Sequence, residues 1–491
     1  MKELTDIALN TAQMNGAQYA DIRIIIDHRE NITVRNNRTV GLNKIETRGF
    51  GVRVICEGSW GFASSSVLNQ ESIVEVTKRA VEIAKASASV KLQDVELAPQ
   101  TPQVDFWQTP VIIDPFQVAL SEKLDHCYEV NGILSAHPQI KVATSSMDFW
   151  MEHQWFASTE GSFIEQRLIK SGGGCSARAV GNHDVQIRSY PLNFRGQFLS
   201  AGYEMIPALK FVENAERVRD EAVALLSADE CPSGKKDLIL SGSQLYLQIH
   251  ESVGHPSELD RVLGFEANYA GRSFATVDKL NNFKYGSELV NLVADNTLPQ
   301  GLSTAGYDDD GVPAQRWYIV KQGILSGYMT NREVAPLIGQ TSSRGSNRAD
   351  GFNNIPIVRI SNLSLLPGKG SLKDIIADTE DGILMDMNKS WSIDQMRLNF
   401  QFGVELAWEI KKGKKTRLLK NANYQGTTPE FWGNCDWIAG PEEWVLWGVN
   451  NCGKGQPGQR AEMSHGCSPA RFKKVTVGVG NDFLMSSTGV V

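Results

Sequence analysis

A change of hydrophobic period near the start of the chain constrains the fold most strongly. Apolar residues at 4–13 have the spacing of a helix, whereas from Ile22 onward they recur every second residue. This alternation continues through residues 20–65 and is interrupted by turn-forming residues at 36–37 and 57–59. Alternation bounded by such turns predicts a meander of four or five antiparallel strands.

The first half of the chain repeats the order helix, strands, helix. A helix that Asn69 or Ser72 can cap follows the meander. An extended, proline-bearing connector at 90–115 then leads to a second helix, strand-like stretches and a third helix. The order therefore occurs twice, at 1–88 and at 115–228. No residues match between the two halves, so an internal duplication stays an open alternative.

A polar segment between residues 228 and 236, with Pro232 and Gly234, predicts a domain boundary. The chain beyond it is rich in glycine, asparagine and alternating apolar residues, with short helices expected only near 371–377 and 427–438. We therefore predict the α+β class. An N-terminal α+β domain, residues 1–228, precedes a β-rich C-terminal domain, residues 235–491.

Composition and charge exclude several classes of protein. The net charge is −7 over 491 residues, which argues against a nucleic-acid-binding protein, because such a protein needs a basic face. The basic residues at 411–417 are expected to form a solvated hairpin turn around Gly413. No segment approaches the roughly 18 apolar residues of a membrane helix, and no secretory signal is evident at the N-terminus.

The seven cysteines are odd in number and form no CxxC pair. A disulfide framework is therefore not expected, and reduced thiols are the better interpretation. Together with the missing membrane and secretory signals, this predicts a cytoplasmic protein.

The chemistry is expected at His250-Glu251-Ser252-Val253-Gly254-His255. A helical HExxH places two histidines one turn apart on a single zinc ion, but here the spacing is one residue longer. On an ideal helix, positions five apart point about 140° away from each other. A single-turn π-bulge absorbs one residue, and Gly254 makes such a distortion cheap. Pro256 disfavours helical dihedrals at His255, so we predict that the helix ends or breaks there.

The spacing alone also fits two structural histidines at a helix end. The neighbouring carboxylate is what favours a catalytic zinc site over that alternative. Peptide hydrolysis at zinc needs neutral imidazoles and a carboxylate beside the attacking water, and Glu251 supplies the carboxylate. A catalytic zinc takes three protein ligands and keeps one open position. The candidates for the third ligand are Glu258, Asp260, Cys452, His465 and Cys467.

These candidates have alternative roles. Glu258 or Asp260 could orient a histidine without touching the metal. Cys452 lies in a glycine-rich loop beside Lys454, whose charge favours a thiolate. Cys452 and His465 are also the pair that a cysteine peptidase would need, but that interpretation leaves His250 and Glu251 unexplained.

The segment from His250 to His255 resembles the HExxxH signature of the active, TldD-like members of the TldD/PmbA metallopeptidases. The resemblance continues at Asp308-Asp309-Asp310-Gly311-Val312-Pro313, at residues 323–329 and at Cys452-Gly453-Lys454-Gly455-Gln456. It is strongest over about 235–460 and weaker in the first half. Pro256 departs from the small residue that the family pattern leads one to expect.

The resemblance implies a set of site residues. Zn²⁺ would be held by His250, His255 and Cys452, and Glu251 would be the general base that activates the attacking water. The segment 460–468 does not match the family pattern, so Cys467 as the third ligand stays open.

The resemblance also implies a fold, partners and substrates. The fold is an α+β N-terminal part followed by a β-rich catalytic part. Members pair as homodimers, or as heterodimers with a PmbA-type paralogue that lacks the zinc motif, and enclose a cavity. Their substrates are unfolded peptides, namely the leader segments of peptide natural products and disordered antitoxins.

We therefore predict a zinc-dependent peptidase that cleaves unfolded or extended polypeptides. Two alternatives are kept. One is a catalytically silent partner subunit of a TldD/PmbA-type complex, and the other is a zinc amidase acting on small molecules.

Overall fold

The structure, a computed structural model, describes residues 1–479 of the chain. Its α-helices are α1 (Lys2–Met14), α2 (Gln70–Ala88), α3 (Leu120–Leu134), α4 (Met205–Ala208), α5 (Phe211–Leu225), α6 (Gly242–Ile249), α7 (Leu259–Leu263), α8 (Leu372–Ala377) and α9 (Thr428–Gly433). Helices and strands are mixed throughout, with strands predominating in the C-terminal half, so the predicted α+β class is confirmed. Within residues 1–479, no helix is both long and apolar enough to cross a bilayer.

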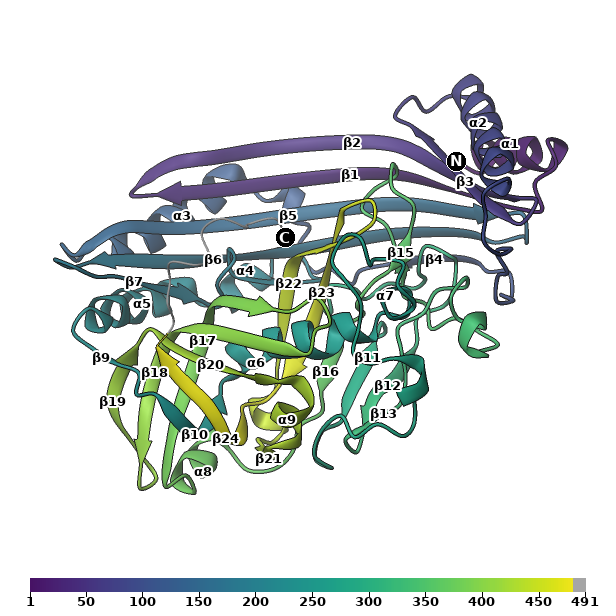
Figure 1. Ribbon diagram of the computed structural model, residues 1–491. Helices are drawn as coiled ribbons and strands as arrows, with labels where there is room; N and C mark the ends of the chain where they lie inside the picture. Colours follow the sequence, from purple (N-terminus) through teal and green to yellow (C-terminus); the bar gives the residue numbers. More distant parts are fainter. Residues whose placement is uncertain (480–491) are drawn as a thin grey trace.

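The N-terminal half forms one eight-stranded sheet of order β3-β2-β1-β5-β6-β4, with β7 and β8 also paired to β6 (Figure 1). Its strands are β1 (Tyr19–Arg35), β2 (Arg38–Cys56), β3 (Ser59–Ser65), β4 (Val104–Gln108), β5 (Ile140–Ser158), β6 (Phe163–Val180), β7 (Val185–Tyr190) and β8 (Gln197–Leu199). Both helix–strands–helix segments contribute to this sheet, because β1 pairs antiparallel with β5.

The meander has three strands, so the prediction of four or five strands at 20–65 is wrong. The two turns lie where the sequence placed them, with positive φ at Asn36, Asn37, Glu57 and Gly58. The strands between them run for 17 and 19 residues, longer than the 5–6 residues typical of a strand. Composition marks the turns, whereas strand length depends on pairing with the neighbouring strands.

Four helices pack at opposite ends of this sheet (Figure 1). Helices α1 and α2 cover an apolar cluster that includes Ile22 and Ile24, whereas α3 and α5 cover a second cluster that includes Phe149. The predicted cap of α2 is confirmed, because the Asn69 side chain accepts a hydrogen bond from the backbone of Ser72. Part of the predicted connector at 90–115 is instead β4, which pairs in parallel with β6.

The C-terminal half contains four further groups of strands. The largest sheet has the order β17-β10-β24-β20-β18-β19-β9, with β21 paired to β24, and two others are β13-β12-β11-β16 and the hairpin β22-β23. Their bounds are β9 (Asp229–Glu230), β10 (Gly234–Leu240), β11 (Leu292–Asp295), β12 (Arg316–Lys321), β13 (Ile324–Leu325), β16 (Leu363–Leu365), β17 (Asp381–Ile393), β18 (Asn399–Lys411), β19 (Lys414–Lys420), β20 (Ala422–Thr427), β21 (Cys435–Ile438), β22 (Val445–Lys454), β23 (Gln459–Cys467) and β24 (Ala470–Val479). A two-residue pair, β14 (Asn347–Arg348) with β15 (Ile357–Val358), completes the region.

Local predictions in this half are mostly confirmed. The basic turn joins β18 to β19, with positive φ at Lys412 and Gly413. A helix occurs near 371–377 as α8. The helix predicted near 427–438 ends at Gly433, because the following residues pair with β24 as strand β21.

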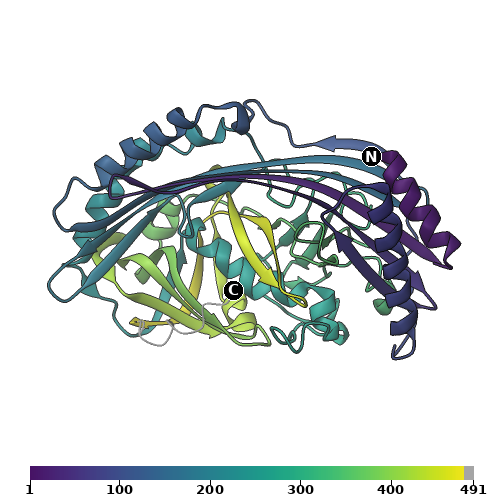
Figure 2. The same cartoon turned by 90° about the horizontal axis from the view of Figure 1, so that it is seen from above.

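The C-terminal elements lie on the concave side of the bowed N-terminal sheet (Figure 2). A cavity of about 1030 Å³ lies between the two halves, lined both by β1, β5 and β6 and by the segment around His250. The halves are joined beside it by buried ion pairs, in which Arg53 bonds Asp310 at 2.8 Å and Arg23 contacts Asp309 at 3.4 Å. The fold thereby places the long sheet opposite the candidate site.

Candidate metal centre

The predicted π-bulge is present. Strand β10 leads directly into α6, which is followed by a π-helical turn over His250–Gly254 and a 3₁₀ turn over His255–Ser257. The wider turn brings the two imidazoles together, with ring centroids 4.8 Å apart. Gly254 has helical dihedrals, φ −60° and ψ −69°, and an added Cβ would lie 2.8 Å from Ile360 Cδ1, so a side chain here would have to displace that methyl group.

The π turn does end before His255, where a 3₁₀ turn begins, but the predicted effect of Pro256 on the dihedrals of His255 is wrong. His255 keeps helical dihedrals, φ −58° and ψ −42°, and the chain leaves the helix only at Glu258, where ψ is 112°. Proline biases the preceding residue away from the helical region without forbidding it. Pro256 itself occupies the start of the 3₁₀ turn, where its missing N–H costs little.

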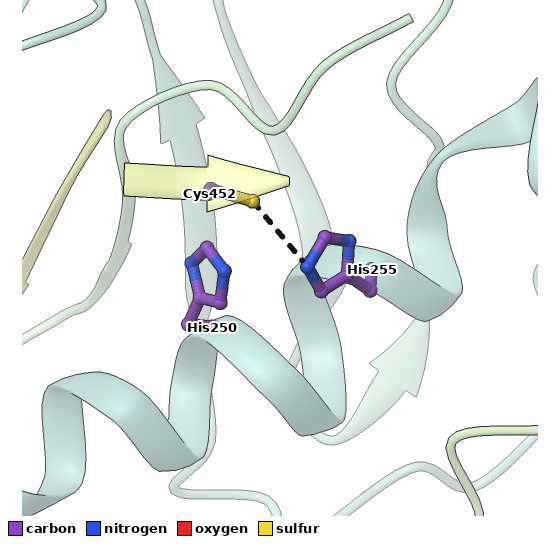
Figure 3. A group of neighbouring side chains, drawn as sticks. All are labelled: His250, His255 and Cys452. Atoms are coloured by element: carbon purple, nitrogen blue, oxygen red, sulfur yellow. Dashed lines mark hydrogen bonds between the residues drawn. The ribbon is translucent and has the colours of Figure 1, made fainter. Parts of the chain in front are cut away.

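Strand β22 brings Cys452 to the two histidines (Figure 3). One nitrogen of each imidazole and the thiol sulfur lie within 4.8 Å of one another, and Cys452 Sγ is 3.5 Å from His255 Nε2. All three side chains are buried. Two nitrogens and one sulfur form a donor set typical of zinc, and ligands of a tetrahedral zinc lie about 3.5 Å apart. The residues therefore fit the ion.

A hydrogen-bond relay fixes the tautomer of His250. His465 Nδ1 lies 2.8 Å from the carbonyl oxygen of Leu363, which can only accept, so this nitrogen carries the proton. His465 Nε2 is then an acceptor, and His250 Nδ1 donates to it over 2.8 Å. This leaves His250 Nε2 with a free lone pair for a metal. Burial lowers the pKa of His250, which favours this neutral form.

Glu258 performs the same task for His255. Its Oε2 accepts a hydrogen bond from His255 Nδ1 over 2.8 Å, so Nε2 points toward Cys452. Burial lowers the pKa of His255, but Cys452 and Glu258 raise it above the ordinary value, so a metal that binds at Nε2 displaces a proton from this ring. Burial raises the pKa of Glu258, but Lys454 and His255 lower it more strongly, so the carboxylate is ionised. Lys454 donates to Asp260 over 2.6 Å. The sequence predicted that Lys454 favours the thiolate, whereas its ammonium forms ion pairs with Asp260 and, at 3.5 Å, with Glu258.

Cys452 is suited to the thiolate state that binds metals. Burial raises the pKa of its thiol, but His255 and Arg359 lower it further, below the ordinary value. Arg359 also donates to the Cys452 carbonyl over 2.5 Å, which holds the strand in place. Cys467 differs: burial raises the pKa of its thiol, and its sulfur lies 3.6 Å from the carbonyl of Gly242.

The remaining candidates lie around this group rather than in it. Within residues 1–479, His250, His255 and Cys452 are the only set of three potential ligands that converge. His465 and Glu258 bond the Nδ1 atoms of the two histidines, and Asp260 bonds Lys454. The sulfur of Cys467 contacts the carbonyl of Gly242 at the start of α6.

Glu251 lies next to the histidines and faces the same cavity. Its Oε2 accepts a hydrogen bond from Arg397 Nη1 at 2.5 Å. Burial raises the pKa of Glu251, but Arg397 and His255 lower it below the ordinary value, so the carboxylate is ionised. Sequence reasoning missed Arg397, because it belongs to a turn 146 residues away in the chain and carries no motif of its own.

Two family models match the chain. The PmbA/TldA metallopeptidase C-terminal domain matches residues 233–479, half of the chain, and the PmbA/TldA metallopeptidase domain 1 matches residues 20–84. The first match contains the whole group of potential metal ligands.

Curated relatives carry the same family or metalloprotease names, and a solved structure shares the fold. A metalloprotease of Methanocaldococcus jannaschii is 29% identical over 408 residues, covering 83% of this chain and 86% of the relative. A zinc metalloprotease TldD homolog of Saccharolobus solfataricus is 22% identical, covering 96% and 98%. The crystal structure of TldE from Thermococcus kodakarensis shares the fold with a TM-score of 0.70 and 15% identity, covering 96% and 99%.

The family match, the names of the relatives and the convergent histidine, histidine and cysteine side chains lead to one assignment. This chain belongs to the TldD/PmbA family and is a zinc metallopeptidase.

Proposed function

We propose that His250, His255 and Cys452 hold the zinc ion and that Glu251 is the general base in hydrolysis of peptide bonds in extended polypeptides. One observation carries this proposal. The three ligand atoms converge within 4.8 Å at the wall of the large cavity, and the carboxylate beside them faces the same space.

Each side chain has a defined task in the reaction. Zinc, when bound, supplies the positive charge that polarises the scissile carbonyl and acidifies the attacking water. Glu251 is buried and ionised, so it can accept the proton of that water and later deliver it to the leaving amine. His465 and Glu258 hold the two imidazoles with their lone pairs toward the ion.

The cavity favours an unfolded substrate. Its volume of about 1030 Å³ accommodates a peptide segment but no folded domain. Much of its wall is polar, with charges that are already paired, such as Arg195 with Asp148 and Lys170 with Glu462. Because these wall charges are already paired, the cavity can accept peptides with varied side chains. We therefore propose leader peptides and antitoxin-like disordered proteins as its substrate classes.

We further propose that the chain works as a dimer, either with itself or with a PmbA-type paralogue. The likeness to TldE supports a shared fold between the two kinds of subunit. Strand β2 supplies an open edge, because residues 38–49 pair with β1, whereas β3 begins its pairing only at Phe50. Val40, Leu42 and Ile45 are exposed there. An open, partly apolar edge is a surface that a partner strand can cover.

The proposed domains are residues 1–228 and 235–491, of which the last twelve lie outside the described residues. The separate eight-stranded sheets support this division. We also propose a cytoplasmic location, since all seven cysteines are free thiols.

Incubation of the purified chain with unfolded casein, with and without a chelator, tests the function. Mass spectrometry should detect chelator-sensitive cleavage, which Glu251→Gln abolishes while zinc stays bound. Cleavage by Glu251→Gln at the wild-type rate would overturn the proposed role of this carboxylate. If the pure chain is inert, the assay is repeated with a PmbA-type paralogue, and inertness there as well would reject the function.

A further inference from the structure

The guanidinium of Arg397 has more hydrogen-bond donors than partners. It carries five N–H groups, and its ion pair with Glu251 uses Nη1. Its Nε is buried and has no hydrogen-bond partner among residues 1–479. The side chain is only 15% exposed, and that exposed part lines the cavity. The buried Nε cannot be reached from the cavity, but Nη2 also makes no hydrogen bond within residues 1–479, where the bond of Nη1 to Glu251 is the one side-chain hydrogen bond of this arginine. The terminal N–H groups on the exposed part of the side chain can therefore bind an acceptor that arrives from the cavity.

The backbone holds Arg397 in place independently of Glu251. It lies in the tight turn between β17 and β18, where its φ is 61°. The Asp394 carboxylate accepts the backbone N–H groups of Leu398 and Asn399, and the Thr428 hydroxyl donates to the Arg397 carbonyl. The turn thus positions this side chain at the metal-facing wall.

A neighbouring arginine shows what a purely structural guanidinium looks like here. Arg261 is fully buried and donates to the Glu266 carboxylate and to three backbone carbonyls. Its bonding capacity is nearly filled within the protein. Arg397 differs in both respects, because it faces the cavity and has an unfilled donor.

We propose that Arg397 is a catalytic residue that donates a hydrogen bond to the carbonyl oxygen of the scissile peptide bond. The inference rests on the proposed function. As the water oxygen bonds to the carbonyl carbon, the water proton passes to Glu251 and the carbonyl π electrons move to the carbonyl oxygen. Negative charge therefore leaves the carboxylate and develops on the substrate oxygen. A guanidinium between the two stabilises the charge at its new place. The carbon–nitrogen bond then breaks, and Glu251 returns the proton to the amine.

Arg397→Gln and Arg397→Lys test the role, with Arg417→Gln as control because Arg417 is a surface arginine that pairs with Glu409. Steady-state kinetics are measured on an unstructured casein-derived peptide that the wild type cleaves. Arg397→Gln is expected to lower kcat by roughly 10²–10³-fold with KM within about threefold, and Arg397→Lys should recover part of the loss. The control should match the wild type.

Binding supplies a second readout that does not depend on turnover. A phosphinic peptide of the same sequence carries a tetrahedral, negatively charged centre that mimics the transition state. Calorimetry should show that Arg397→Gln weakens its binding by the same factor as kcat. Binding of the intact peptide should change little when Arg397→Gln is combined with Glu251→Gln to prevent cleavage. Zinc content, measured in parallel, should remain one ion per chain.

Three outcomes would overturn the inference: unchanged kcat and phosphinate affinity, a loss confined to KM, or loss of zinc from both Arg397 variants. The controls separate this result from failure of the proposed function. If the wild type cleaves and Glu251→Gln does not, the function stands and only the role of Arg397 is rejected. If Glu251→Gln cleaves normally, the function itself fails.

Discussion

Two buried turns in this protein are rich in ionisable side chains, and they use them in opposite ways. At residues 308–310 the carboxylates are satisfied within the protein. Asp308 accepts three backbone N–H groups, while Asp309 and Asp310 bond arginines of the N-terminal sheet. At residues 250–255 a neighbour holds each imidazole by Nδ1, and no carboxylate or backbone group among the described residues 1–479 bonds the ring nitrogens that point toward Cys452, whose sulfur lies 3.5 Å from His255 Nε2.

The contrast shows what marks a reactive site. Burial and charge are common to both turns, so neither identifies function. The difference is bonding capacity that the protein leaves unfilled and directs toward a cavity. The aspartate turn joins the two halves of the chain, whereas the histidine turn can take an ion and a substrate.

Removal of the thiolate should have the largest effect. Cys452→Ser is expected to weaken zinc binding by more than the roughly 100-fold limit seen for residues that only orient ligands, and to abolish peptide cleavage. Cys467→Ser on the same hairpin is the matched control and should keep its zinc. Metal analysis of the purified variants checks both. Equal zinc content in Cys452→Ser and wild type would assign the third ligand elsewhere.

Neutralising the carboxylate should separate metal binding from catalysis. Glu251→Gln is expected to lower kcat by about 10²–10⁴-fold, because the attacking water loses its base, while zinc stays at one ion per chain. Glu152→Gln, which changes another carboxylate of the cavity wall, should leave kcat near the wild-type value. If kcat fell strongly in Glu152→Gln and not in Glu251→Gln, the general base would have to be assigned to the opposite wall of the cavity.

The relay behind His250 should have an intermediate effect. His465→Phe removes the acceptor that fixes the His250 tautomer, so zinc affinity should fall by about 10–100-fold. Competition with a chromogenic chelator measures the change. Unaltered affinity would mean that the relay has no role in orienting the ligand.

A substitution at the aspartate turn should lower the stability of the fold without changing zinc affinity. Arg53→Met leaves Asp21 and Asp310 buried without their shared partner, which should lower the free energy of unfolding by about 3–5 kcal/mol. Denaturant unfolding measures this, and zinc affinity of the folded protein should not change. The exposed Arg417→Gln is the control and should leave the unfolding midpoint unchanged. Zinc loss in folded Arg53→Met would contradict the separation of a structural aspartate turn from a metal-binding histidine turn.

Local patterns in the sequence predicted much of the fold. The turns at 36–37 and 57–58, the cap at Asn69 and the basic hairpin turn all follow from residue chemistry within a few positions. Strand length and the addition of β4 to β6 depend on distant partners, which no local pattern reports. For the same reason the number of strands in the meander was overestimated.

The candidate site likewise has a part that local sequence predicts and a part that depends on distant residues. The π-turn follows from the five-residue spacing and Gly254, both of which are local. The neighbours that complete it, His465 behind His250 and Arg397 beside Glu251, come from 215 and 146 residues away. Sequence chemistry could propose His465 as a metal ligand but could not assign it an orienting role, because that role depends on which of its nitrogens faces which neighbour.

X-ray absorption at the zinc K-edge of the purified enzyme tests the central assignment most directly. We expect one sulfur at about 2.3 Å and two imidazole nitrogens at about 2.0–2.1 Å, with the sulfur contribution absent in any zinc that Cys452→Ser retains. A wild-type spectrum without sulfur, or with sulfur that persists in Cys452→Ser, would contradict it.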